Sequence, residues 1–225
     1  MHLSAALVPP REVLDHVIGM VAGVEPPRAP AAAGGAAGRH AAWAGRRLAR
    51  RKGQAAPPPP PAGPMLDLLS PFRMTVPVAK FGNLALFDAN RLADALEQQA
   101  QDWQAPRLHL HGGVALEPAG DVHAWAGLAG DVDALHDIKA GVIRAAQGLQ
   151  LFVDRRVFRP QLRLGSITDL TTEAYLEELL AALDRYEGPP WWQSTVSLVS
   201  PAEHGPTGPA FRVHREIKLG PPVTH

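Results

Sequence analysis

A chain of 225 residues, 46% hydrophobic and without cysteine, is long enough for one large or two small domains and has no disulfides or thiolate metal sites. Lys plus Arg and Asp plus Glu are equal at 22 each, so the net charge does not indicate a polyanionic partner. No stretch approaches the roughly 18 uninterrupted apolar residues typical of a transmembrane helix, and the start of the chain lacks the pattern of a secretory signal. We therefore expect a soluble, cytoplasmic monomer with no membrane partner.

The first predicted elements are a strand and a helix separated by a Pro-Pro turn. Residues 3–8 form an apolar run that indicates a strand, which Pro9-Pro10 ends. From residue 11 to residue 23, apolar side chains recur at the spacing of one helix face: Val13, Leu14, Val17, Ile18 and Val21. We expect residues 1–25 to supply the first strand and helix of a domain.

Residues 26–64 differ from the rest of the chain in composition and charge. They contain seven basic residues and no acidic one, and most positions are Pro, Gly or Ala, including the five-proline run 57–61. Such a segment does not bury enough apolar surface to offset chain entropy, so we expect a disordered insertion. Two interpretations of its basic stretch, residues 39–52, stay open: a basic helix that docks on RNA or an acidic surface, and a solvated arm.

The remainder of the chain, residues 65–225, contains the patterns of further strands and helices. Alternating apolar residues predict strands, and apolar residues three and four positions apart predict helices. The predicted strands include 107–116, 121–128, 195–199 and 210–219, and the predicted helices are 88–103, 131–147 and 171–186. Gly112-Gly113 indicates a bulge in the first of these strands, and Asp88 is the expected N-cap of the first helix. This mixture of elements predicts an α+β protein.

Two further stretches share one pattern and are predicted to be strands. They are residues 72–78, Phe-Arg-Met-Thr-Val-Pro-Val, and residues 158–165, Phe-Arg-Pro-Gln-Leu-Arg-Leu-Gly. Each alternates apolar with polar residues close to a proline. Because side chains at i and i+2 of a strand lie on one face, Arg73 should share a face with Thr75, and Gln161 should share a face with Arg163.

This pair of stretches resembles the two His-x-Thr/Ser motifs of the 2H phosphoesterase superfamily, which includes 2′-5′ RNA ligases and cyclic nucleotide phosphodiesterases. The family's second motif, Phe-x-Pro-His-x-Thr-Leu, corresponds to residues 158–164. Its first motif, His-x-Thr-Leu with a Phe-Leu-Gly-like turn after it, corresponds to residues 73–76 followed by 80–82. Arg73 and Gln161 stand at the two histidine positions, and Thr75 alone keeps a motif hydroxyl.

The resemblance covers most of the chain outside residues 26–64 and implies a fold. Members of the superfamily have a bilobal α+β fold in which two antiparallel sheets flank a central cleft, with one motif in each lobe. Residues 65–225 are then expected to complete the domain that residues 1–25 begin.

The resemblance also implies that the motif histidines act as general base and general acid, which requires groups that exchange protons near neutral pH. Gln161 has no titratable proton, and Arg73 stays protonated at any working pH. Guanidinium, hydroxyl and amide groups instead suit a phosphate, so the expected phosphate-binding residues are Arg73, Thr75, Gln161 and Arg163. The alternative that stays open is a decayed site whose arginines pair with nearby acidic residues.

Two other pairs of residues have both a functional and a structural interpretation. His109 and His111 lie at i and i+2 of a predicted strand, so they share a face as metal ligands would, but two ligands are fewer than a zinc site needs. Trp191-Trp192 suits either stacking of a base or packing between a helix and a sheet. Neither a metal nor a cofactor is expected.

The function expected from the resemblance is that of a catalytically degenerate 2′-5′ RNA ligase family-like protein. It would bind a phosphate-bearing ligand, an RNA end or a cyclic nucleotide, in the cleft between the lobes. Two alternatives stay open. One is an active cyclic phosphodiesterase or RNA ligase that uses non-standard residues such as His109 or His111, and the other is a structural relic that acts as a protein-interaction domain.

Overall fold

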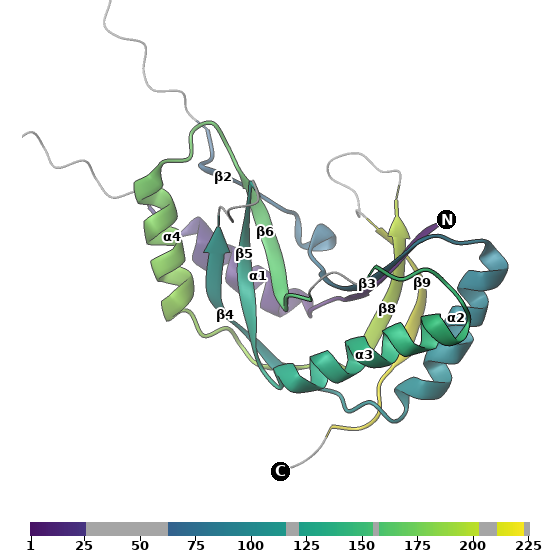
Figure 1. Cartoon of the computed structure of the whole chain (residues 1–225). Helices are drawn as coiled ribbons and strands as arrows, with labels where there is room; N and C mark the ends of the chain where they lie inside the picture. Colours follow the sequence, from purple (N-terminus) through teal and green to yellow (C-terminus); the bar gives the residue numbers. More distant parts are fainter. Residues whose placement is uncertain (26–62, 116–121, 155–157, 203–210, 223–225) are drawn as a thin grey trace, which may run out of the picture.

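The computed structural model describes residues 1–25, 63–115, 122–154, 158–202 and 211–222 (Figure 1). Its elements are β1 (His2–Leu7), α1 (Arg11–Ala22), β2 (Leu66–Leu68), a 3-10 helix (Pro71–Arg73), β3 (Val76–Asn83), α2 (Leu86–Ala100), β4 (Arg107–Ala115), β5 (His123–Gly130), α3 (Val132–Gly148), β6 (Gln161–Ile167), α4 (Glu173–Arg185), β7 (Trp191–Trp192), β8 (Thr195–Pro201) and β9 (Phe211–Lys218). Of the helices in these ranges, none combines the length and apolar character needed to cross a bilayer. The predicted insertion, residues 26–64, lies almost wholly outside the described residues.

The strands form two antiparallel sheets, one in each lobe (Figure 1). The four-stranded sheet has the order β3-β1-β8-β9, and the five-stranded sheet has the order β2-β6-β5-β4-β7. In Figure 1 the helices α2 and α3 accompany the four-stranded sheet, whereas α1 and α4 accompany the five-stranded one. The predicted bilobal α+β fold with two antiparallel sheets is therefore confirmed.

The helices cover the sheets with apolar faces, and polar contacts add to this packing. Helix α4 packs on β4, where Leu183 lies so close to Gly113 that no larger residue fits at that position. A hydrogen bond holds α1 against the residue that follows α4: His16 Nδ1 lies 2.7 Å from the Tyr186 hydroxyl. Burial raises the pKa of Tyr186. This contact thus links α1 to the C-terminal end of α4.

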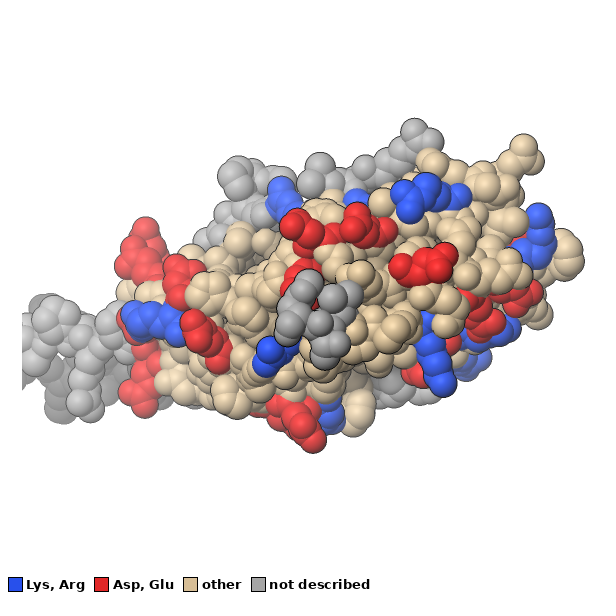
Figure 2. Space-filling view, turned by 90° about the horizontal axis from the view of Figure 1, so that it is seen from below, with Lys and Arg blue, Asp and Glu red and all other residues tan. Residues whose placement is uncertain are grey.

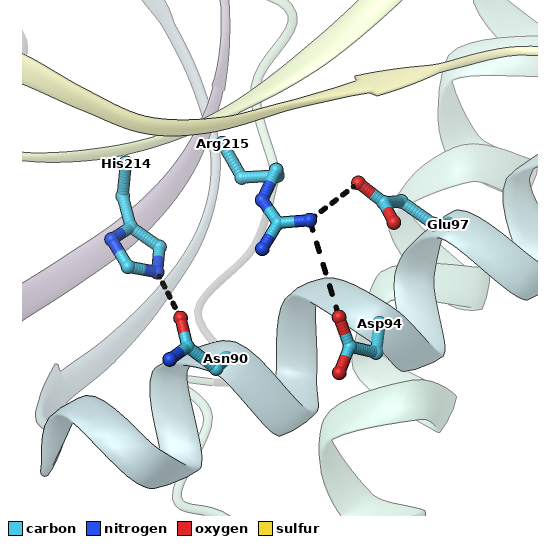
Figure 3. Close-up of polar contacts among 5 residues, drawn as sticks. All are labelled: Asn90, Asp94, Glu97, His214 and Arg215. Carbon is cyan, nitrogen blue, oxygen red and sulfur yellow. Dashed lines mark hydrogen bonds and ion pairs between the residues drawn. The ribbon is translucent and has the colours of Figure 1, made fainter.

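Polar contacts also hold the edge strand β9 against α2 (Figure 3). Arg215 Nη1 lies 3.0 Å from Glu97 Oε1 and 4.0 Å from Asp94 Oδ1. His214 Nε2 lies 3.1 Å from Asn90 Oδ1. Two successive residues of β9 therefore contact three positions along α2, which fixes the strand at that edge of the sheet.

The first motif stretch is only partly a strand, so the strand predicted over 72–78 is wrong at its beginning. Residues 71–73 form a 3-10 helix, and β3 begins at Val76. Pro71, whose φ is fixed near the helical value, occupies the start of this turn, and Met74 N donates to Pro71 O at 3.2 Å. Phe72 is not a core residue: it is 57% exposed, and the Arg11 guanidinium lies 4.8 Å from its ring centroid.

The other predicted elements match the structure within a few residues, with one correction at a helix start. Helix α2 begins at Leu86 with Ala85 at the N-cap, so Asp88 is not the cap. Asp88 lies in the first turn, where its negative charge interacts favourably with the helix dipole. Its Oδ1 lies 3.4 Å from Arg91 Nη1. The predicted bulge in β4 is present, since the register shifts between Leu110 and Gly113 and Gly112 has a φ of 74°.

Helix α4 has a side-chain cap, and its removal should have a measurable cost. Tyr175 N donates to Thr172 Oγ1 at 3.2 Å, so Thr172→Ala leaves one N–H of the first turn without its partner. We expect a loss of about 1 kcal/mol of unfolding free energy, or roughly 2–4 °C in Tm, by thermal denaturation followed by circular dichroism. Thr172→Ser keeps the hydroxyl and should recover most of the loss; equal destabilisation by both variants would contradict the capping role.

Candidate anion-binding site

Strand β6 places Gln161 and Arg163 on one face, as its alternation predicts. Leu162 and Leu164 are fully buried in the core, whereas Gln161 and Arg163 point the other way and are half-buried. Pro160 lies just before the strand, where its missing N–H removes no ladder bond, and its carbonyl accepts from Leu128 N at 2.9 Å. The second motif therefore presents an amide and a guanidinium side by side.

The guanidinium of Arg163 is only partly satisfied by its neighbours. Nη2 donates to Ser166 Oγ at 3.0 Å, whereas the buried Nε has no hydrogen-bond acceptor among the described residues. A buried N–H without an acceptor costs about 1–3 kcal/mol. The Ser166 hydroxyl is thus the hydrogen-bond acceptor of Arg163 among the described residues, and Arg163 places a permanent positive charge on the face that it shares with Gln161.

Ser166 connects Arg163 to a second strand. Its hydroxyl lies 3.3 Å from His123 Nδ1, and the edge of the His123 ring meets Trp125 with a centroid distance of 6.1 Å and an interplanar angle of 70°. In the β5–β6 ladder, His123 lies opposite Ser166, and Trp125 lies opposite Arg163. We call this set the β5–β6 polar face: His123, Trp125, Gln161, Arg163 and Ser166.

Sequence reasoning missed Ser166 and Trp125, although a signal for Trp125 was present. His123-Ala124-Trp125 alternates like the motif strands and therefore places two rings on one face. Which residues of β6 lie beside these two rings depends on the register between β5 and β6. That register includes an irregularity between Ala124 and Trp125. Neither the pairing nor the irregularity follows from local pattern.

Arg73 and Thr75 lie on the segment that connects the five-stranded sheet to the four-stranded sheet. The chain leaves the five-stranded sheet after Leu69, whose N–H donates to Leu164 O at 2.8 Å, and enters the four-stranded sheet at Val76. Strands β3 and β6 approach one another without sharing a ladder. Arg73 ends the 3-10 helix and Thr75 immediately precedes β3. The segment that carries both residues therefore begins beside β6, and it leads into β3, a strand that comes close to β6.

The predicted placement of the four residues on two central strands needs correction. Gln161 and Arg163 lie on β6, an interior strand of the five-stranded sheet. Arg73 and Thr75 lie outside any strand, and β3, which follows them, is at the edge of the four-stranded sheet as described. The reason is the Pro71 turn, which replaces the first half of the expected strand. Whether the four residues bind one anion stays a prediction.

In the histidine pair on β4, His111 contacts the main chain. His111 Nδ1 lies 2.9 Å from Tyr186 O, and the rings of His109 and His111 are 6.4 Å apart at their centroids. Across the described ranges, no group of three His, Asp or Glu side chains is placed to hold a metal ion. The geometry thus gives His111 a structural contact with the residue that follows α4.

The two adjacent tryptophans have different environments. Trp191 is 7% exposed, belongs to the core and donates from Nε1 to Gln193 Oε1 at 3.0 Å. Trp192 is 44% exposed and pairs with Arg107 at the end of β4. Packing therefore explains Trp191, and only Trp192 has a substantial exposed surface.

Two surface depressions lie away from the β5–β6 polar face. One, of about 350 Å³, is lined by the loop before β4 and by the first turn of α3, including Asp131, Asp133 and Asp137. The other, of about 470 Å³, is lined by the segment after α3, including Phe152 and Asp154. Neither is lined by a predicted site residue. The acidic side chains that line the first depression would repel an anion. The residue types of the two motifs therefore indicate the position of an anion site better than these depressions do.

Comparison with known proteins places the fold. No family model matches the chain, and no curated protein matches it. Among solved structures, TT0787 of Thermus thermophilus is similar, with a TM-score of 0.63 at 15% identity over 97% of this chain and 98% of that one. LigT of E. coli complexed with 3′-AMP is similar with a TM-score of 0.62 at 12% identity over 97% of each chain. A crystal structure described as a phosphoesterase gives 0.56 at 12% identity over 97% of this chain and 98% of that one.

These similarities extend over nearly the whole length of both chains, and they show a shared fold. The chain has the LigT-like fold, which is the architecture that the resemblance of its two motifs to 2H phosphoesterases predicted. E. coli LigT has also been crystallised with NADP+, with phosphate and with ATP.

Proposed function

We propose that the chain is a catalytically degenerate member of the 2H phosphoesterase superfamily, resembling the 2′-5′ RNA ligases, and that it binds a phosphate-bearing ligand between its lobes. The ligand would be an RNA end or a cyclic nucleotide. The observation that carries the proposal is Arg163, a half-buried guanidinium with no carboxylate partner among the described residues, in the stretch of β6 that resembles the second motif of the superfamily. The nucleotide and phosphate complexes of E. coli LigT support the ligand class by analogy.

Loss of catalysis follows from the residue types at the two histidine positions. Gln161 neither gains nor loses a proton, and Arg73 stays charged. Removing a general acid or base typically forfeits about 10²–10⁴-fold in rate for each group. A guanidinium fork, by contrast, binds phosphate oxygens through two parallel hydrogen bonds. The substitutions thus remove proton transfer and favour retention of the anion.

A second candidate function is an active cyclic phosphodiesterase or RNA ligase with relocated chemistry, and His123 is the residue that favours it. Its imidazole is connected through Ser166 to Arg163, whereas His111 is engaged with the main chain. A histidine can exchange a proton near neutral pH. If the chain is an enzyme, His123 is therefore a better substitute base than His109 or His111.

The charge distribution argues for local rather than long-range attraction of the ligand. Figure 2 shows one face of the molecule, where Lys and Arg are interspersed with Asp and Glu. Outside residues 26–64 the chain has 15 basic and 22 acidic residues, so it has no overall excess of positive charge to attract an anion. A ligand bound by such a protein depends on particular donors such as Arg163 and not on a single-signed field. Residues 26–64, which we propose to be a disordered basic insertion, lie largely outside the described residues and are not needed for this argument.

The test combines binding and turnover of 2′,3′-cyclic AMP by the full chain. Calorimetry should give saturable binding, and chromatography of the same mixture should show no ring opening to a phosphomonoester. Turnover that is lost in His123→Ala but kept in His136→Ala, a control histidine on α3, would replace the binding function by the enzyme. Absence of both binding and turnover would favour the remaining alternative, a structural relic that acts as a protein-interaction domain.

A further inference from the structure

Trp125 is the aromatic residue nearest in register to Arg163. The two are directly opposed in the antiparallel β5–β6 ladder, and opposed side chains have Cβ atoms about 4.5–5.5 Å apart. Both project from the face opposite the buried Ala124, Leu162 and Leu164, and both are half-buried. A flat indole therefore lies beside the cation that the proposed function assigns to the phosphate.

Neighbouring contacts hold this indole in place. Arg163 donates to Ser166, Ser166 contacts His123, and the His123 ring meets Trp125 edge-on. The four residues form one series of contacts that crosses once from β6 to β5 and ends at Trp125, opposite Arg163 in the ladder. Groups that are positioned before binding lose less conformational freedom when a ligand arrives, so a ring fixed in this way is a better stacking surface than a mobile one.

We propose that Trp125 stacks the base of a nucleotide whose phosphate is bound by Arg163. This inference rests on the proposed function. It narrows the class of phosphate-bearing ligands to those in which the sugar that carries the phosphate also carries an aromatic base. Because Arg163 and Trp125 are nearest neighbours across the ladder, the pair spans a single nucleotide. An aromatic ring can stack on any of the bases, so the expected ligand is a nucleotide with any base.

Trp192 is the alternative stacking residue, and its position makes it a matched control. It is the more exposed of the two, but it lies on β7, three strands away from β6 in the sheet order β6-β5-β4-β7. With strands about 4.8 Å apart, this places the two strands roughly 14 Å from one another. A base stacked on Trp192 therefore cannot belong to the nucleotide whose phosphate Arg163 binds.

The experiment compares two probes on the full chain by calorimetry: 2′,3′-cyclic AMP and the 2′,3′-cyclic phosphate of methyl riboside, which lacks the base. We expect Trp125→Ala to weaken the first about five- to 150-fold, in line with the stacking contribution of one base, and to leave the second within about twofold. Trp125→Phe should keep most of the affinity, because it keeps an aromatic face. Trp192→Ala should bind both probes as the wild type does.

The outcomes separate this inference from the proposed function. If the wild type binds both probes equally well, or if Trp125→Ala weakens both by the same factor, the phosphate site stands and the stacking role is overturned. If the wild type binds neither probe, the proposed function fails and the inference fails with it. Trp125→Leu keeps apolar volume without a ring; if Trp125→Ala does not fold, the loss of base selectivity in this variant decides the question.

Discussion

Replacing Arg163 by alanine should weaken the binding of 2′,3′-cyclic AMP by about 10- to 100-fold. A charge-assisted hydrogen bond contributes about 1.5–3 kcal/mol, and 1.4 kcal/mol corresponds to a tenfold change in affinity. Arg163 is half-buried on the β5–β6 polar face, so its charge is less screened than that of a surface arginine. Removing Arg73 as well should nearly abolish binding, because the proposed site then keeps no guanidinium. Calorimetric titration of the single and double variants measures both effects.

The controls distinguish binding from stability. Arg163→Lys should bind poorly, since an ammonium lacks the planar fork, while Arg212→Ala, at an exposed position on β9, should bind normally. The partner of Arg163 in the described structure is the Ser166 hydroxyl and not a carboxylate, so Arg163→Ala should lower Tm by only a few degrees. A large fall in Tm with unchanged affinity would show that the residue is structural.

The largest expected loss of stability comes from Phe81→Ala. Phe81 is 1% exposed, lies in β3 and is among the largest fully buried side chains of the described core. Truncating a buried phenylalanine costs about 3–5 kcal/mol, because apolar contacts are lost and a cavity is left. For a chain of this size that corresponds to roughly 6–20 °C in Tm, measurable by circular dichroism or calorimetry.

Phe87 provides the matched control for this variant. It is the same residue type, six positions later in the chain, and it is 71% exposed in the first turn of α2, where the Arg91 guanidinium lies 5.6 Å from its ring centroid. Phe87→Ala removes the same atoms from water rather than from the core, so Tm should change by about 2 °C or less. Comparable losses from both variants would contradict the assignment of Phe81 to the core.

The sequence predicted the second motif better than the first, and the difference has a physical cause. In residues 158–165 the alternation of Leu162 and Leu164 with Gln161 and Arg163 reports true burial, because the strand has a core on one side. In residues 72–78 the same alternation combines two structures. The proline at position 71 starts a turn, and Phe72 finds its partner in Arg11 on a helix instead of in the core. Local periodicity does not distinguish these cases.

The residues that surround the motif residues could not be predicted from the sequence, for a different reason. Ser166 and Trp125 become parts of the site through strand pairing, and the pairing partner of β6 depends on the order of strands in the sheet. The short strands β2 and β7 were also missed, since three and two residues are too few to show a period. Both fix that order by occupying the two edges of the five-stranded sheet.

The position of β1 has a consequence for how the protein is made. This strand lies between β3 and β8, so Ala5 faces Ala79 on one side and Leu198 on the other. Ribosomes add about 5–20 residues per second, so roughly 10 to 40 s pass between the emergence of β1 and that of β8. Throughout that time one side of an apolar strand has no partner. The sheet that begins with β1 is therefore completed only after β8 has been made, and a nascent chain stalled before residue 195 exposes an edge to which other unfolded chains can pair.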